Sequence, residues 1–149
     1  MTFRKIILFA GVLAHGICHA EYLIDFDEMT KYQSPVAPSA AEKFNTDPDA
    51  PKIVVFQPDV DKAIKAPFPI EIFFQPANGS KVSWDSFKVL YGNYQFDITN
   101  RFLKEARLSE NGLYIPKADI PPGYHKLTIR IADERKKYAQ KDFLVMVEK

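Results

Sequence analysis

Very few side chains in this sequence could act as catalytic acids, bases or nucleophiles. Of its three histidines and one cysteine, His15, His19 and Cys18 all fall within the first 20 residues, which have the features of a removable signal. A Ser-His-Asp arrangement needs a base beside the nucleophile, and we expect the remaining histidine, His125, at the surface or rim of a strand. No two carboxylates stand out as the pair that a glycosidase requires. We therefore predict no catalytic residues and no enzymatic activity.

Metal-binding side chains are equally sparse. Zinc and copper sites draw on His, Cys and Met, and after removal of the signal the chain keeps one histidine and two distant methionines. Calcium prefers oxygen ligands, for which Asp59-Val60-Asp61 and Asp133-Glu134 are the best candidates. Both segments are more typical of charged turns. We predict neither a metal site nor a cofactor.

Residues 1–20 have the order of features that defines a secretory signal peptide. Arg4 and Lys5 precede an apolar run from Ile6 to Ala14, and small residues lead to Ala20. A membrane anchor needs about 20 apolar residues, so the run predicts no stable membrane span. Acylation of Cys18 is a further alternative, which the preceding residues fit badly. We expect cleavage after Ala20 and a periplasmic or secreted bacterial protein.

Residues 21–50 read as an acidic, proline-containing leader. They carry seven acids and two lysines, whereas residues 51–149 carry sixteen Lys/Arg and twelve Asp/Glu. No stretch is dominated by basic residues, so we expect no nucleic-acid binding. The second half of the leader resembles a flexible linker. Its first part, with Tyr22, Leu23, Ile24 and Phe26, is too apolar for a simple spacer.

From residue 51 onward the pattern is that of short strands between turns. Apolar residues alternate with polar ones along about seven segments, and turn signals recur every 8–12 residues. The predicted strands are 52–57, 69–75, 87–91, 94–98, 113–115, 124–132 and 139–148, with residues 101–109 as a short strand or helical turn. This pattern predicts an all-β antiparallel sandwich over residues 51–149.

The segments Ala66–Ile72 and Pro122–Leu127 resemble those of bacterial immunoglobulin-like or fibronectin-III-like domains of exported proteins. In such domains a proline-glycine turn starts the penultimate strand. The resemblance implies an immunoglobulin-like architecture without implying a function. The chain departs from antibody-type domains because it lacks a cysteine pair, and because Trp84 precedes the predicted 87–91 strand. The resemblance also implies a structural role for Pro122, Gly123 and Tyr124, with Tyr124 as a buried tyrosine corner whose hydroxyl bonds the backbone near Lys117 to Pro121.

Strand alternation also predicts apolar side chains on the outer faces of the sandwich. If Phe143, Val145 and Val147 point inward, Leu144 and Met146 point outward. The same reasoning places Phe73 and Leu90 outward. Exposed apolar patches tend to mark interfaces. Two alternatives stay open: the apolar part of the leader covers this face, or the residues are scattered singly.

These observations favour a non-catalytic interaction module whose partner is another protein of the cell envelope, or an accessory subunit of an envelope assembly. The alternative is a carbohydrate-binding module, which needs a flat platform of exposed rings. Trp84, Tyr91, Tyr94 and Tyr114 supply aromatic side chains for one. Two or more coplanar exposed rings would favour sugar, and an exposed row of Leu, Met or Phe would favour protein.

Overall fold

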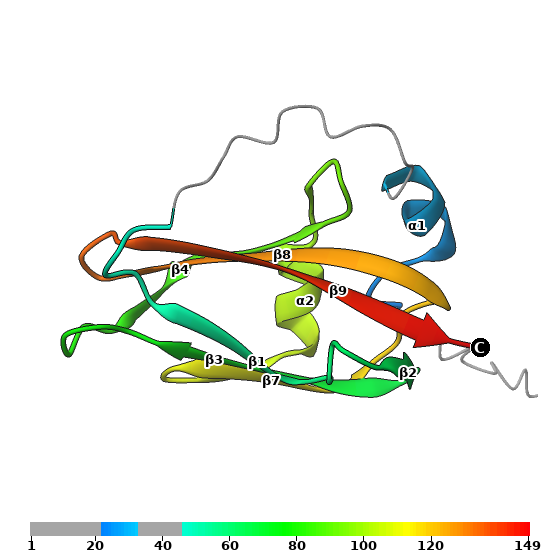
Figure 1. Ribbon diagram of the computed structural model, residues 1–149, viewed down its shortest axis with the longest axis horizontal. Coiled ribbons are helices and arrows are strands. Elements are labelled where there is room, and N and C mark those ends of the chain that lie inside the picture. The colour runs from blue at the N-terminus through cyan, green and yellow to red at the C-terminus, as the bar shows by residue number, and fades with distance from the viewer. Residues whose placement is uncertain (1–21, 33–45) are drawn as a thin grey trace, which may run out of the picture.

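The structure is a computed structural model that describes residues 22–32 and 46–149 (Figure 1). The predicted signal peptide, residues 1–20, lies outside the described residues. The elements, in chain order, are α1 (Phe26–Tyr32), β1 (Lys52–Gln57), β2 (Ala63–Lys65), β3 (Phe68–Gln75), β4 (Val82–Tyr91), β5 (Phe96–Asp97), α2 (Thr99–Glu105), β6 (Arg107–Ser109), β7 (Gly112–Ala118), β8 (Gly123–Asp133) and β9 (Tyr138–Glu148).

The strands form two layers that enclose the core (Figure 1). One sheet has the order β1-β3-β7-β6 and the other has the order β2-β9-β8-β4-β5. Neighbouring strands are antiparallel except β2, which runs parallel to the end of β9. The prediction of an all-β sandwich is therefore confirmed at the level of two packed, mostly antiparallel sheets.

The core follows from period-two alternation along the long strands. In β3, Ile70, Ile72 and Phe74 are buried while Phe73 between them is 40 % exposed. The inward residues of β8 and β9 are buried in the same way: Leu127, Ile129, Ile131, Phe143, Val145 and Val147. Each such side chain contributes about 1.5–3 kcal/mol when fully buried. Because no disulfide is possible with a single cysteine, this burial is the main stabilising term.

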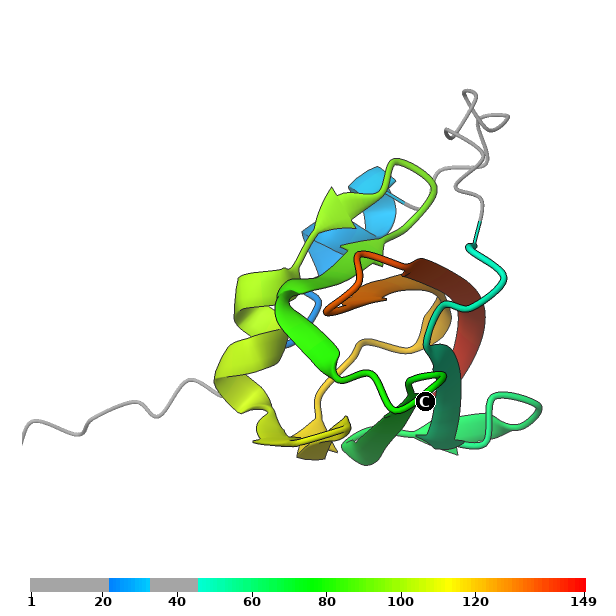
Figure 2. The same ribbon diagram turned by 90° about the vertical axis from the view of Figure 1, so that its left-hand side faces the viewer.

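Three strands differ from those that the sequence predicts: β2 is not expected, β4 begins at Val82 rather than at 87, and the expected strand at 94–98 is only the two-residue β5. The stretch 101–109, expected as a short strand or helical turn, lies in α2 and β6. Phe102 on α2 is fully buried, so α2 contributes to the core. Figure 2 shows α2 at one side of the sandwich, where it joins the two sheets. Trp84 lies within β4 rather than before it, and packs edge-on against Phe74 with ring centroids 5.6 Å apart.

The leader is part of the domain at both of its described ends. Leu23 and Ile24 belong to the hydrophobic core, with 2 % and 0 % of their surface exposed. Residues 46–47 run along β9, where the Asp47 N–H donates to the Tyr138 carbonyl at 2.9 Å. Residues 22–32, the part of the leader that is too apolar for a simple spacer, are attached to the domain because two large aliphatic side chains are buried. Within the described ranges, neither helix has the length and hydropathy of a membrane span.

Candidate functional site

Three apolar side chains lie together on the outer face of the five-stranded sheet. Tyr124 on β8 is directly opposite Met146 on β9. Leu144, two residues before Met146, is the neighbouring outward-facing residue of β9. Tyr124 is 66 % exposed and Leu144 is 59 % exposed, while Met146 is half-buried. We call Tyr124, Leu144 and Met146 the apolar patch. The outward register predicted for Leu144 and Met146 is confirmed.

Two other residues predicted to belong to such a surface lie elsewhere. Leu90 is only 7 % exposed, so its predicted exposure is wrong. It is outside the core cluster, and its pairing with Thr128 places it on the outer face of the five-stranded sheet. The helix α1 lies on the same side of that sheet (Figure 1). Phe73 is exposed as predicted, but it is on the four-stranded sheet, next to Phe56. The structure therefore brings Leu144 and Met146 together and separates them from Phe73.

The helix α1 covers the part of the outer face beside the apolar patch. The carbonyl of Tyr32 accepts the N–H of Asn93 at 3.1 Å, and the Tyr32 ring stacks on Phe96 with centroids 4.5 Å apart. Gly92 permits this approach, because a Cβ atom there would lie 2.4 Å from the Tyr32 carbonyl oxygen. In the middle of α1, the Met29 sulfur would lie 3.1 Å from a Cβ on Gly123. The residues expected to cover this face do not do so, because Leu23 and Ile24 lie in the core while Tyr22 and Phe26 are exposed. Tyr32 of α1 instead contacts the β4–β5 turn, and Leu144 stays exposed.

Polar pairs bound the apolar patch along the same two strands. Thr128 donates to the Asp142 carboxylate at 2.8 Å, and the Lys126 ammonium lies 3.4 Å from that carboxylate. Further along, the Arg130 guanidinium donates to the Gln140 side-chain oxygen at 2.7 Å. The outer face is therefore apolar at the start of β8 and the end of β9, and polar over the remainder.

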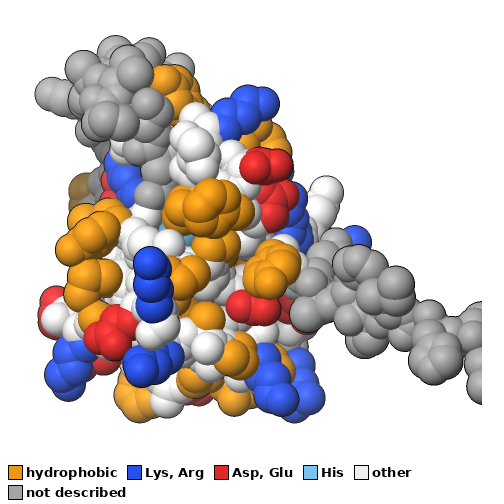
Figure 3. Space-filling model, turned by 90° about the vertical axis from the view of Figure 1, so that its right-hand side faces the viewer, with side chains coloured by type: hydrophobic (Ala, Val, Ile, Leu, Met, Phe, Trp, Pro, Cys, Tyr) orange, Lys and Arg blue, Asp and Glu red, His pale blue; other side chains and the backbone are white. Residues whose placement is uncertain are grey.

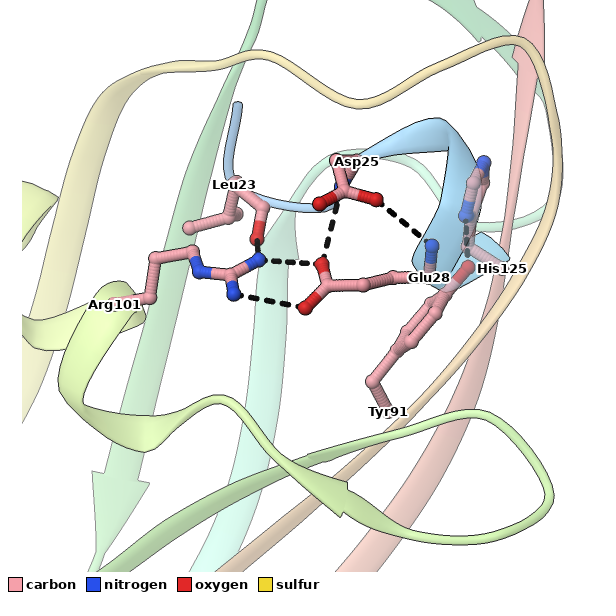
Figure 4. Close-up of polar contacts among 6 residues, drawn as sticks. All are labelled: Leu23, Asp25, Glu28, Tyr91, Arg101 and His125. Atoms are coloured by element: carbon pink, nitrogen blue, oxygen red, sulfur yellow. Dashed lines mark hydrogen bonds and ion pairs between the residues drawn. The ribbon is translucent and has the colours of Figure 1, made fainter. Parts of the chain in front are cut away.

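An ion pair between Glu28 and Arg101 attaches α1 to α2 (Figure 4). The second guanidinium nitrogen of Arg101 donates to Glu28 Oε1 at 2.8 Å, and the same guanidinium reaches the Leu23 carbonyl. Glu28 and Asp25 also form a reciprocal capping box, with the Glu28 N–H donating to Asp25 Oδ1 at 2.8 Å. The hydrogen bond from Arg101 is the largest influence on the pKa of Glu28 and lowers it, against the opposing effect of burial. The spacing Asp25-x-x-Glu28 was the available sequence signal for this helix start.

His125 is fully buried, so its predicted position at the surface is wrong. It lies two residues before Leu127 on β8, so both side chains point into the sandwich. Its Nε2 lies 2.7 Å from the Pro121 carbonyl and its Nδ1 lies 2.8 Å from the Tyr91 hydroxyl (Figure 4). Because a carbonyl can only accept, Nε2 carries the proton and the Tyr91 hydroxyl donates to Nδ1. Burial lowers the pKa of His125, which favours the neutral ring, against a smaller opposing effect of the Pro121 hydrogen bond.

The prediction of a buried tyrosine corner at Tyr124 is wrong, because Tyr124 is next to the inward-facing His125 and therefore faces outward. Gly123 has a φ of 145°, so a glycine is required at the predicted turn. Tyr124 then points outward and is among the most exposed aromatic side chains of the described residues. The hydrogen bond expected from Tyr124 to residues 117–121 is made instead by His125 to Pro121. Pro122 and Gly123 keep a structural role, whereas Tyr124 is a surface residue.

A cleft of about 530 Å³ opens at the end of the sandwich where β9 finishes. Its apolar lining includes Tyr22, Phe26, Ile120, Pro121 and Pro122. Figure 3 shows hydrophobic side chains gathered over this end of the molecule, with charged side chains around them. The volume is within the range of about 300–1,000 Å³ of small-molecule sites.

The candidate calcium segments are charged turns in the structure. Asp133 Oδ1 accepts the N–H groups of Arg135 and Lys137, each at 2.9 Å, within the β8–β9 turn. Asp59 accepts the Asp61 N–H and pairs with Lys62 at 2.7 Å. Over residues 22–32 and 46–149, no three His, Cys, Asp or Glu side chains gather as a metal site would require.

The exposed rings of Phe56 and Phe73 are neighbours but do not form a flat platform, because their planes meet at 75°. Tyr91 is fully buried and Trp84 is half-buried, so neither supplies an exposed ring. Among the rings of the described segments, the near-parallel pairs are Tyr32–Phe96 and Tyr91–His125, which are half-buried and buried respectively.

Comparison with known proteins identifies no relative: no family model, no curated protein and no solved structure matches this chain.

Proposed function

We propose that this protein is an exported, non-catalytic interaction domain that binds another protein of the bacterial cell envelope through the apolar patch. The observation that carries the proposal is the juxtaposition of Tyr124, Leu144 and Met146 on one exposed sheet face. Tyrosine and methionine are enriched at protein interfaces, and tyrosine is enriched among the residues that dominate binding energy. The polar pairs of Asp142 and Arg130 beside the patch supply the hydrophilic rim that such interfaces have.

The proposed domain is immunoglobulin-like. The strand order supports this. Strands β1, β3, β7 and β6 form one sheet, the remaining strands form the other, and β2 runs parallel to β9. Trp84 within β4, packed on Phe74 and Phe87, adds the aromatic core that such sandwiches place on this strand. Export is proposed from the order of charged, apolar and small residues in 1–20.

The geometry of the rings favours a protein ligand over a carbohydrate. A sugar platform needs coplanar exposed rings, whereas the exposed pair Phe56 and Phe73 is nearly perpendicular. A row of outward-facing apolar side chains such as Leu144 and Met146 is the feature expected of a protein-binding face.

The substitution Leu144→Asp tests the proposal. It places a charge within the apolar patch, at a side chain that is 59 % exposed, so we expect loss of partner binding with little change in melting temperature. The matched control is Leu108→Asp, because Leu108 is 50 % exposed on β6 of the opposite sheet.

The assay is site-specific photo-crosslinking from positions 144 and 108 in the envelope of cells that produce the protein. A discrete crosslinked protein from position 144, lost on Tyr124→Ala and absent from position 108, supports the proposal. Equal crosslinking from both positions, or none from position 144, contradicts it.

A further inference from the structure

The outer edge of β9 is covered by other parts of the chain at its two ends. At the start of β9, the Tyr138 N–H donates to the Asp47 carboxylate at 2.8 Å, and the Gln140 N–H donates to Thr46 Oγ1 at 3.2 Å. At its end, Ala63, Ile64 and Lys65 of β2 pair with Met146–Glu148. Each cover satisfies backbone groups that an edge strand would otherwise leave open.

These contacts fix which β9 residues direct their backbone groups outward. Tyr138 and Gln140 use both their N–H and their C=O away from β8, since the Asp47 N–H and the Thr46 hydroxyl donate to the two carbonyls. Backbone direction alternates along a strand in an antiparallel ladder. The N–H and C=O of Asp142 and Leu144 therefore point to the same open edge, and those of Phe143 point to β8.

Between the two covers, the backbone of Asp142 and Leu144 has no partner among the described residues. No backbone bond of the turns and loops reaches either residue, and β2 begins its pairing only at Met146. Both residues are exposed. The edge thus carries two N–H and two C=O groups at the spacing of a β-ladder, directly beside the side chains of the apolar patch.

We infer that this open edge binds an extended polypeptide segment, which adds as a short strand against Asp142 and Leu144 and lays its apolar side chains on the apolar patch. The inference rests on the proposed function and specifies its partner as an extended, apolar peptide. Alternating backbone donors and acceptors complement a peptide backbone, and neither a sugar nor a helix presents that pattern. Pockets and patches for alternate side chains then provide the specificity.

Lys141 covers the inner side of the β9 edge. Its side chain points inward, like that of Phe143, and reaches the other sheet, where the ammonium donates to the Ile53 carbonyl at 3.3 Å. The lysine therefore closes the gap between β9 and β1 and protects the edge from indiscriminate sheet extension. The added strand is consequently expected to make its apolar contacts on the outer face, with Leu144.

The experiment uses the full chain labelled with ¹⁵N and a panel of synthetic seven-residue peptides with Val, Leu or Phe at alternate positions and lysine at both ends. Amide exchange is measured with and without each peptide. In the free protein, the amides of Asp142 and Leu144 should exchange faster than those of Phe143 and Val145. A bound peptide should slow exchange at Asp142 and Leu144, and N-methylation of the peptide backbone should abolish the effect.

A proline variant separates backbone pairing from side-chain contact. Asp142→Pro removes an outward N–H without touching the ladder to β8, because proline is tolerated where the N–H faces away from the sheet. Asp142→Ala is the matched control, since it loses the same contacts to Thr128 and Lys126 but keeps the N–H. We expect Asp142→Pro to bind the best peptide about tenfold more weakly than Asp142→Ala, the factor for loss of about one hydrogen bond.

The outcomes distinguish this inference from the proposed function. Equal peptide binding by the two Asp142 variants, or no protection by any peptide of the panel, overturns strand addition. If Asp142→Pro keeps the crosslink from position 144 while Leu144→Asp loses partner binding, the apolar patch remains a protein-binding site and only the strand-addition mode is wrong.

Discussion

The clearest stability prediction concerns Ile24, which the sequence places in a leader and the structure places in the core. Ile24 is 0 % exposed and Leu23 beside it is 2 % exposed. Replacing Ile24 with alanine removes the equivalent of about three methylene groups, worth about 2.4 kcal/mol of transfer free energy. The residual cavity adds to this, so we expect a loss of about 2–5 kcal/mol in the free energy of unfolding.

The measurement is urea unfolding of the full chain, followed by thermal denaturation. For a chain of this size, each kcal/mol corresponds to about 2–4 °C, so the melting temperature should fall by about 10 °C. Phe26→Ala is the matched control, because Phe26 is only two residues further along and is 64 % exposed. We expect the control to change stability by about 0.5 kcal/mol or less.

A loss below about 1 kcal/mol for Ile24→Ala, or equal losses for the two variants, would refute the argument that the leader is an integral part of the core. Such a result would mean that the first segment lies on the domain without contributing to its folding.

Three further predictions concern polar groups. Burial lowers the pKa of His125 in the folded state, so the unfolded chain binds the extra proton first as the pH falls. The contribution of the neutral ring to stability should be complete above the unfolded pKa of about 6.5 and should decrease as the pH falls toward the folded value. Urea midpoints measured against pH should show this slope in the native chain and not in His125→Gln. Tyr91→Phe should cost about 1–3 kcal/mol because it removes the hydroxyl that donates to buried His125 Nδ1, whereas Tyr124→Phe should be neutral, and the two are compared by thermal denaturation. Glu28→Gln should make the leader sensitive to limited proteolysis, because the charge-assisted hydrogen bonds between residue 28 and Arg101 are lost. In the native chain, the stability that the Glu28–Arg101 pair contributes should be present above the normal glutamate pKa and lost as the pH falls through the lowered folded pKa.

Much of the sandwich could be predicted from the sequence because strand alternation is a local property. In β3 and β9, inward and outward residues follow from hydrophobic period alone, as Phe74, Phe143 and Leu144 illustrate. The Pro122-Gly123 turn was equally local, since only a positive φ at Gly123 lets the chain enter β8 there. The inward position of His125 is also local, because it lies two residues before the buried Leu127 on the same strand.

The composition of the candidate site depended on tertiary structure. Alternation gives the face of a strand but not which sheet the strand joins, so only the fold separates Phe73 from Leu144. Alternation also cannot show what covers a face, and Leu90 is buried on the face where α1 lies. The attachment of α1 through Arg101 joins residues 73 positions apart.

The sequence by itself determined most of the long strands, the inward faces of β3 and β9 and the scarcity of catalytic groups, because each of these depends on neighbouring residues or on composition. The tertiary structure decided that Leu23 and Ile24 complete the core, that Tyr124 joins Leu144 and Met146, and that no described residue pairs with the backbone of Asp142. The physical reason is that burial, hydrogen bonding and exposure of these groups depend on partners distant in the chain, which only the packing of the two sheets and the leader brings into contact.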